Sequence, residues 1–92
     1  MELYHLRTFI TVAEEQNLTR AAQKLFTSPP SVSAHIKALE EELHVVLFNR
    51  TPKGMTLTSA GETLKEKARL ILDSAQDLMH TAQSLRDEPA GQ

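Results

Sequence analysis

Apolar residues recur every three or four positions through most of the chain, which is the spacing of helices with one buried face. The first such stretch runs from about Leu3 to Glu15, with an apolar face of Leu3, Leu6, Phe9, Ile10 and Ala13. Asn17 is a suitable N-cap for a second, shorter helix, "LTRAAQKL" at residues 18–25. Its small alanines would let another helix approach closely. The first 25 residues therefore predict two packed helices.

A third helix is predicted to begin at a pair of prolines and to run to about Leu43. Ser28 is a good N-cap. Pro29 and Pro30 fill the first two helical positions, where the backbone N–H has no partner within the helix. The predicted buried face consists of Val32, Ile36, Leu39 and Leu43. Five small or basic residues fall mostly off this face in the first half of the helix: Ser31, Ser33, Ala34, His35 and Lys37. An N-terminal half of this kind is suited to insertion against a polyanion, to which the helix dipole adds attraction.

Two β-prone runs follow, Val45–Arg50 and Met55–Thr58. Between them, "TPKG" places Pro52 and Gly54 at the second and fourth positions of a turn, as a type I turn prefers. We therefore predict a two-stranded hairpin with Lys53 at its tip. Taken alone, the pattern fits an ordinary surface hairpin equally well.

The last predicted element is a helix that is capped by Thr58 or Ser59 and extends to about Arg86, roughly 40 Å in length. Its apolar residues form a three-heptad seam: Leu64, Ala68, Ile71, Ala75, Leu78, Ala82 and Leu85, widened by Leu72 and Met79. Such a seam is typical of helices that pair along their length. Because a domain this small cannot cover so long an apolar stripe, we expect pairing with a second copy. The alternative is that the helix packs on its own domain.

The order helix, helix, helix, hairpin, long helix predicts a mainly α fold. Residues 1–58 would form a winged helix-turn-helix, residues 59–87 a linker or dimerisation helix, and residues 88–92 the start of a hinge. In this design the third helix enters the DNA major groove, and the wing reaches phosphates or the minor groove.

Charge and composition reduce the number of function classes that fit this sequence. The net charge is −2, but residues 16–39 and 43–61 contain no acid and could form one basic face. Charge runs are also common on solvated faces that bind nothing. The absence of Cys excludes disulfides and thiolate metal sites and suits a reducing cytosol. No apolar run is long enough for a membrane span, and no secretory signal is visible at the N-terminus.

Three functions compete at this point. The first is a dimeric DNA-binding regulator, and the second is a winged-helix module for protein interaction without specific DNA binding. The third, an enzyme, has little support, because the four histidines have no i, i+4 metal-binding spacing and there is no glycine-rich phosphate loop. Those histidines are His5, His35, His44 and His80, of which only His35 has a DNA-facing position. We therefore expect no enzymatic activity, cofactor or metal.

Nearly the whole chain resembles the N-terminal region of LysR-type transcriptional regulators. The matching stretches are "LRTFITVAEEQNLTRAAQKL", "SVSAHIKALEEEL", "LFNRTPKGMTLTSAGE" and the long helix that follows. The resemblance implies a winged helix-turn-helix and a dimer of two antiparallel linker helices. It also implies binding to an interrupted, partly palindromic operator by a cytoplasmic, nucleoid-associated protein of bacteria.

By position, the resemblance also implies DNA-contacting residues. Those on or near the recognition helix are Ser28, Pro29, Pro30, Ser33, Ala34 and Lys37. Lys53 matches the basic residue at the wing tip, Arg50 an arginine at the base of the wing, and Thr19 a position that can meet a phosphate. The family's response to small molecules resides in a further effector-binding domain, which is missing from this sequence.

Three positions depart from the family pattern. Position 29 is usually Gln, and Pro29 could at most touch a thymine methyl group. Position 34 is often Arg, so Ala34 removes another potential contact. Position 44 is often Gly, so His44 must end the third helix without the freedom of glycine at positive φ. The first two departures bear on specificity and not on the fold.

Overall fold

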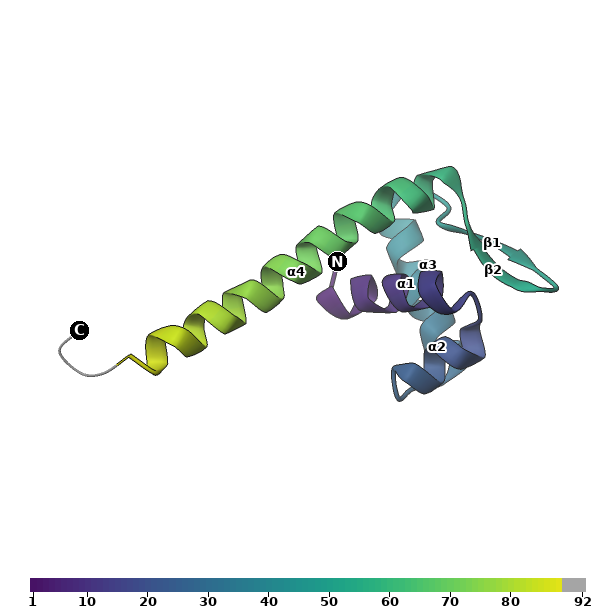
Figure 1. The fold of residues 1–92 in the computed structure, drawn as a ribbon. Helices are drawn as coiled ribbons and strands as arrows, with labels where there is room; N and C mark the ends of the chain where they lie inside the picture. The colour runs from purple at the N-terminus through teal and green to yellow at the C-terminus, as the bar shows by residue number, and fades with distance from the viewer. Residues whose placement is uncertain (89–92) are drawn as a thin grey trace.

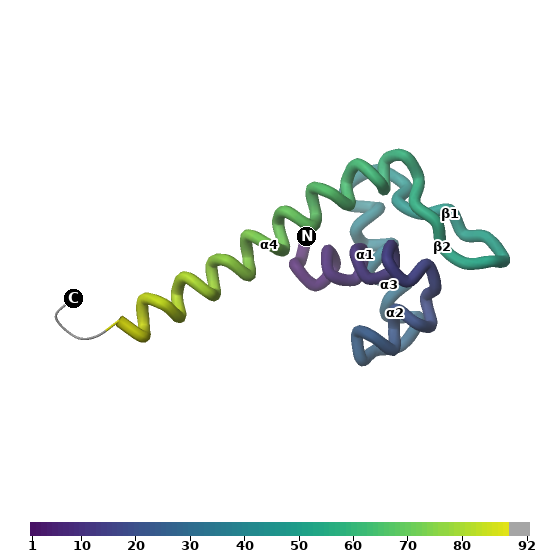
Figure 2. Tube along the Cα trace, in the orientation of Figure 1, coloured from purple at the N-terminus to yellow at the C-terminus, as the bar shows by residue number. Residues whose placement is uncertain are grey.

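Four helices and one hairpin make up the computed structural model, which describes residues 1–88 (Figure 1). The helices are α1 (Leu3–Glu15), α2 (Leu18–Lys24), α3 (Pro29–Leu43) and α4 (Ser59–Arg86). The strands β1 (Phe48–Thr51) and β2 (Gly54–Leu57) pair antiparallel, with Phe48 opposite Leu57 and Thr51 opposite Gly54. Three short helices gather into one unit, the hairpin projects from it on one side, and α4 extends away on the other (Figures 1 and 2). The predicted mainly α fold with a two-stranded wing is confirmed.

The core forms where α1, α2 and α3 meet. Phe9 and Val12 from α1 pack with Ile36 and Leu39 from α3, and all four are at most 1% exposed. Ala21 and Ala22 of α2 are also buried, so the close approach expected from small side chains is observed. Two buried threonines on α1 were not anticipated. Thr8 and Thr11 donate their hydroxyls to the carbonyls of Tyr4 and Arg7 at 2.9 and 2.8 Å, which satisfies these polar groups inside the helix bundle.

The predicted helix starts are confirmed by their hydrogen bonds. The Asn17 side chain accepts from the Arg20 N–H at 2.8 Å, and the Ser28 hydroxyl accepts from the Ser31 N–H at 3.3 Å. Thr58, and not Ser59, caps α4 by accepting from the Gly61 N–H at 2.9 Å. At the other end of α3, His44 takes the left-handed conformation at φ 59°, as the missing glycine required.

The first strand is shorter than predicted. We expected it to begin at Val45, but the residues from Val45 to Leu47 precede the strand, and Leu47 is bonded to other parts of the chain. The Leu47 N–H donates to the Glu40 carboxylate at 2.7 Å, and its carbonyl accepts from the Thr58 N–H at 3.0 Å. Its side chain is fully buried. These contacts to α3 and to the start of α4 hold the segment against the core and remove it from strand pairing, which β1 begins only at Phe48.

The long helix α4 divides into two halves. In the first half, Ala68 is buried and Leu64 and Leu72 pack against the core, so this part of the predicted dimerisation seam faces its own domain. Beyond this region α4 projects into solvent, and the molecule measures 60 × 25 × 19 Å (Figure 2). There Leu78, Met79 and Leu85 are 71, 69 and 65% exposed. Packing on its own domain therefore accounts for the first half of the seam, whereas pairing of the exposed second half with another copy stays a prediction. Of the predicted hinge, residues 89–92 lie outside the described residues.

Candidate nucleic-acid interface

The helix-turn-helix is formed by α2, a short turn and α3. The turn closes through hydrogen bonds from the Phe26 N–H to the Gln23 carbonyl at 3.2 Å and from the Thr27 N–H to the Ala22 carbonyl at 2.9 Å. Phe26 itself adopts a left-handed conformation, at φ 56°, and its side chain is 96% exposed. The sequence pattern could not predict the exposure of Phe26, because an apolar residue next to a helix end is equally consistent with burial.

The N-terminal half of α3 presents an open surface. Pro29, Pro30, Ala34 and Lys37 are exposed there, while Ser31 and Ser33 are half-buried. The opposite side of the same turns carries Val32 and Ile36, which are buried in the core. The structure therefore leaves uncovered most of the side chains that the sequence assigned to DNA contact on this helix, including Ser28, whose hydroxyl donates to that of Ser31 at 3.0 Å.

The wing is held in a fixed position relative to α3. The guanidinium of Arg50, on β1, donates from Nη2 to the Ser33 hydroxyl at 2.8 Å. On the other strand, the Met55 N–H donates to the Gln16 carbonyl at the end of α1, at 3.0 Å. Gly54 lies against that same carbonyl at φ 133°, and any Cβ at this position would overlap the carbonyl oxygen. The three contacts orient Lys53 at the exposed tip of the hairpin.

Thr19 and Arg50 share one groove of about 290 Å³ between the start of α2 and the wing. The groove is lined by Asn17, Leu18, Thr19, Arg50, Thr51, Gly54 and Met55. Residues 17–19 come from the first acid-free segment of the sequence, and the wing residues of the groove come from the second. The fold thus brings both segments to one surface, in line with the predicted basic face.

Not every cation on the acid-free segments is available to a ligand. Glu15 pairs with Lys24 at 3.0 Å and with Arg20 at 3.9 Å, so one carboxylate offsets part of the positive charge of α2. Among residues 1–88, Lys37, Arg50 and Lys53 form no ion pair with a carboxylate. Within the two acid-free segments, the cations without a carboxylate partner therefore lie on α3 and the wing.

His35 differs from its predicted DNA-facing position. Its Nδ1 lies 2.9 Å from the Thr8 hydroxyl, and its ring packs edge-on against Tyr4 at 5.0 Å between ring centroids. The ring of His5 lies 5.4 Å away. Burial, and secondarily the nearby His5, lowers the pKa of His35. The side chain therefore joins α1 to α3 and is turned away from the surface formed by Ala34 and Lys37.

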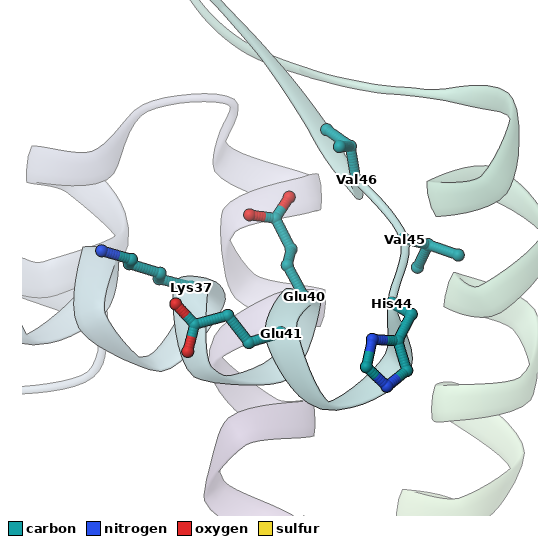
Figure 3. A pocket seen from close by; sticks show the side chains of 6 residues that line it. All are labelled: Lys37, Glu40, Glu41, His44, Val45 and Val46. Carbon is teal, nitrogen blue, oxygen red and sulfur yellow. The ribbon is translucent and has the colours of Figure 1, made fainter.

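A second groove, of about 410 Å³, lies along the C-terminal half of α3 (Figure 3). It is lined by Lys37, Glu40, Glu41, His44, Val45 and Val46. Figure 3 shows Lys37 at one end of the groove, extending toward the N-terminal half of the helix. Because two glutamates line the groove, it is unsuited to a phosphate, and the surface open to DNA ends near Lys37.

The fold and this surface define a winged helix-turn-helix protein, and comparison with known proteins gives its family. Residues 3–62 match the bacterial regulatory helix-turn-helix proteins of the lysR family, and the chain belongs to that family. It is 45% identical over 92 residues to the transcriptional regulator BsdA of Bacillus subtilis, covering 99% of this chain and 32% of that protein. It is 53% identical over 67 residues to CysL of the same organism, covering 73% of this chain and 22% of that protein. The chain thus spans less than a third of the length of these curated relatives.

Solved structures show the same fold. The DNA-binding domain of CbnR, crystallised in complex with DNA, is 38% identical and superimposes with a TM-score of 0.89, covering 94% of this chain and 99% of that one. The DNA-binding domain of BenM, in complex with its catB site 1 DNA, is 34% identical with a TM-score of 0.92, covering 97% and 100%. The predicted resemblance to LysR-type regulators is confirmed over nearly the whole chain.

Proposed function

We propose that this chain binds double-stranded DNA as a homodimer and is the DNA-binding part of a transcriptional regulator. The observation that carries the proposal is the surface formed by α3 and the wing, where Lys37, Arg50 and Lys53 are exposed and free of carboxylate partners. The relatives are regulators, and the similar domains of CbnR and BenM were crystallised with DNA.

Contacts to phosphates supply most of the affinity in this proposal. The N-terminal half of α3 lies in the major groove, the Lys53 ammonium approaches the minor groove, and Lys37 meets the backbone. Thr19 and Arg50 line one groove and can hold a single phosphate between them. Arg50 uses only Nη2 for Ser33, so its other N–H groups remain available.

A few contacts on α3 supply the sequence preference. Ser33 accepts a hydrogen bond from Arg50, and its hydroxyl hydrogen is still free to donate to a base. Pro29, Pro30 and Ala34 offer only apolar contact, which suits thymine methyl groups. Ser28 and Ser31 donate to each other or to phosphates. His35 is left out of this set, because it is engaged with Thr8.

The homodimer forms through the exposed side of α4. Its apolar residues there are Ile71, Ala75, Leu78, Met79, Ala82 and Leu85. Two-fold symmetry of the protein calls for an operator of two related half-sites separated by an interruption. We further propose that residues 1–58 and 59–87 act as separate DNA-binding and linker units in the bacterial cytoplasm. Any response to a small molecule then depends on a domain beyond the hinge at 88–92.

Charge removal on the proposed surface tests this function. We expect Lys37→Gln and Lys53→Gln each to weaken binding to any DNA and to reduce the slope of log affinity against log salt by about one. Lys24→Gln is the matched control, since Lys24 is already paired with Glu15. Unchanged affinity in the first two variants would contradict the proposal. It would then favour a module that binds protein.

A further inference from the structure

The backbone donors in the first turn of α3 are either missing or already bonded. Pro29 and Pro30 carry no N–H. The Ser31 N–H donates to the Ser28 hydroxyl at 3.3 Å, and the Val32 N–H donates to the Ser28 carbonyl at 3.1 Å. The first turn of a helix commonly offers its N–H groups to an anion. In this chain, recognition of DNA at the start of α3 therefore has to come from side chains.

The side chains that are exposed on this part of α3 are mostly apolar. Pro30 and Ala34 are exposed and stand four positions apart, so they share one face of the helix, and the exposed Pro29 lies next to them. Ser33 lies between them and is half-buried, and its oxygen already accepts from Arg50 at 2.8 Å. Its remaining hydroxyl hydrogen can be donated to an acceptor on more than one kind of base, so Ser33 discriminates weakly.

An apolar side chain can distinguish bases in the major groove by one feature, the methyl group at C5 of thymine. The other groups that the bases present there are hydrogen-bond donors and acceptors. Uracil is thymine without this methyl group, and 5-methylcytosine is cytosine with it. Thymine and 5-methylcytosine differ at C4, which carries a carbonyl in the first and an amino group in the second. The side chains of proline and alanine form no hydrogen bond with either group.

We propose that Pro29, Pro30 and Ala34 select pyrimidines that carry a methyl group at C5, so that thymine and 5-methylcytosine are equivalent where these residues meet the operator. The inference rests on the proposed DNA binding and names the chemical group that is read. The Gln and Arg that are common at positions 29 and 34 in the family can hydrogen-bond to base edges, which proline and alanine side chains cannot do. Binding by this chain then depends on whether cytosines in the operator are methylated.

Exchange of single bases in a duplex tests this methyl readout. Each thymine of the half-site selected from a random DNA library is replaced in turn by uracil, which removes only the methyl group. At one or more of these positions we expect binding to weaken about fourfold, the factor that corresponds to one buried methyl group. At the same positions, 5-methylcytosine paired with guanine should bind about fourfold more tightly than cytosine does. Fluorescence anisotropy of labelled duplexes measures both ratios.

Two variants assign the effect to α3. Pro29→Gln and Ala34→Ser each place a polar side chain at an exposed position, so the fold should remain intact. Each should bring the ratio of thymine to uracil affinity closer to one at the position that it contacts. Lys37→Gln is the control, because loss of a phosphate contact weakens binding to the thymine and uracil duplexes alike and leaves their ratio unchanged.

The outcomes separate this inference from the proposed function. Ratios of about four for both exchanges, lowered by Pro29→Gln or Ala34→Ser but not by Lys37→Gln, support the methyl readout. A ratio of one for either exchange, or ratios that Pro29→Gln and Ala34→Ser both leave unchanged, overturns it and leaves DNA binding standing. A library without an enriched half-site also overturns it, since no methyl group is then read. A chain that binds no duplex overturns both the inference and the proposed function.

Discussion

Arg50 on the wing and Ser33 on α3 are joined by a hydrogen bond of 2.8 Å from Nη2 to the hydroxyl oxygen. The two residues are 17 positions apart in the sequence, and their bond lies on the surface proposed to meet DNA. In the proposed complex, the wing and α3 would therefore meet DNA as one preorganised unit.

The link predicts energetic coupling between the two residues in DNA binding. Arg50→Ala and Ser33→Ala should each weaken binding, and the double variant should lose less than the sum of the two losses. We expect a coupling of about 0.5–1.5 kcal/mol, the range of one hydrogen bond. A double-mutant cycle on DNA affinity measures it. Strictly additive losses would mean that wing and helix act independently.

Gly54 allows the wing to approach α1, and Gly54→Ala should displace it. The backbone at φ 133° disfavours any side chain, and the new Cβ would overlap the Gln16 carbonyl oxygen. We expect a loss of about 1–3 kcal/mol in the free energy of unfolding, measured by urea denaturation, together with weaker DNA binding. Thr56→Ala, on the exposed side of the same strand, is the control. Equal stability of the two variants would contradict the proposed role of Gly54.

His35 predicts a pH dependence of stability. Its pKa is lowered in the folded chain, chiefly by burial, so below its ordinary value of about 6.5 the unfolded state binds more protons. The stabilising contribution of neutral His35 is therefore complete above about pH 6.5 and is lost as pH falls through the folded pKa. The urea midpoint should decrease from about pH 7.5 to about pH 5.5. The decrease should be smaller in His35→Asn, with the same substitution at the exposed His80 as control.

Leu78 is the most exposed leucine of α4, and it lies at the middle of the projecting half of the seam. Leu78→Asp should weaken dimerisation at least about 100-fold, because an unpaired carboxylate in an apolar contact costs about 3 kcal/mol or more. Leu70→Asp, at a similarly exposed position off the seam, should leave the dimer intact. Analytical ultracentrifugation compares the two. If Leu78→Asp remains a dimer, another surface holds the two subunits together.

Local patterns predicted the helices well, because their signals lie within a few residues. The caps at Asn17 and Ser28 and the end of α4 at Arg86 depend on near neighbours in the chain. Strand β1 was predicted too long because Leu47 is held by Glu40 and Thr58, contacts that only the folded chain creates.

The candidate site was predicted in composition but not in its internal contacts. Exposure of Pro29, Ala34 and Lys37 follows from the helical period of α3. The Arg50–Ser33 bond, and the packing of His35 on Tyr4 and Thr8, arise where elements cross at angles that periodicity does not specify. The division of the α4 seam into a covered and an exposed half likewise depends on how far the contact between α1 and α4 extends along α4, which the sequence pattern does not specify.

Selection of bound duplexes from a random DNA library, at near-physiological salt, tests the central claim most directly. If the chain is a dimeric, sequence-specific DNA-binding domain, the bound pool should be enriched in a two-fold symmetric motif with an interrupted centre. The bases selected nearest Pro29 and Ala34 would show which bases are preferred where these residues stand in place of the Gln and Arg that are common in the family. A pool without enrichment, with weak binding that added salt abolishes, would contradict the claim.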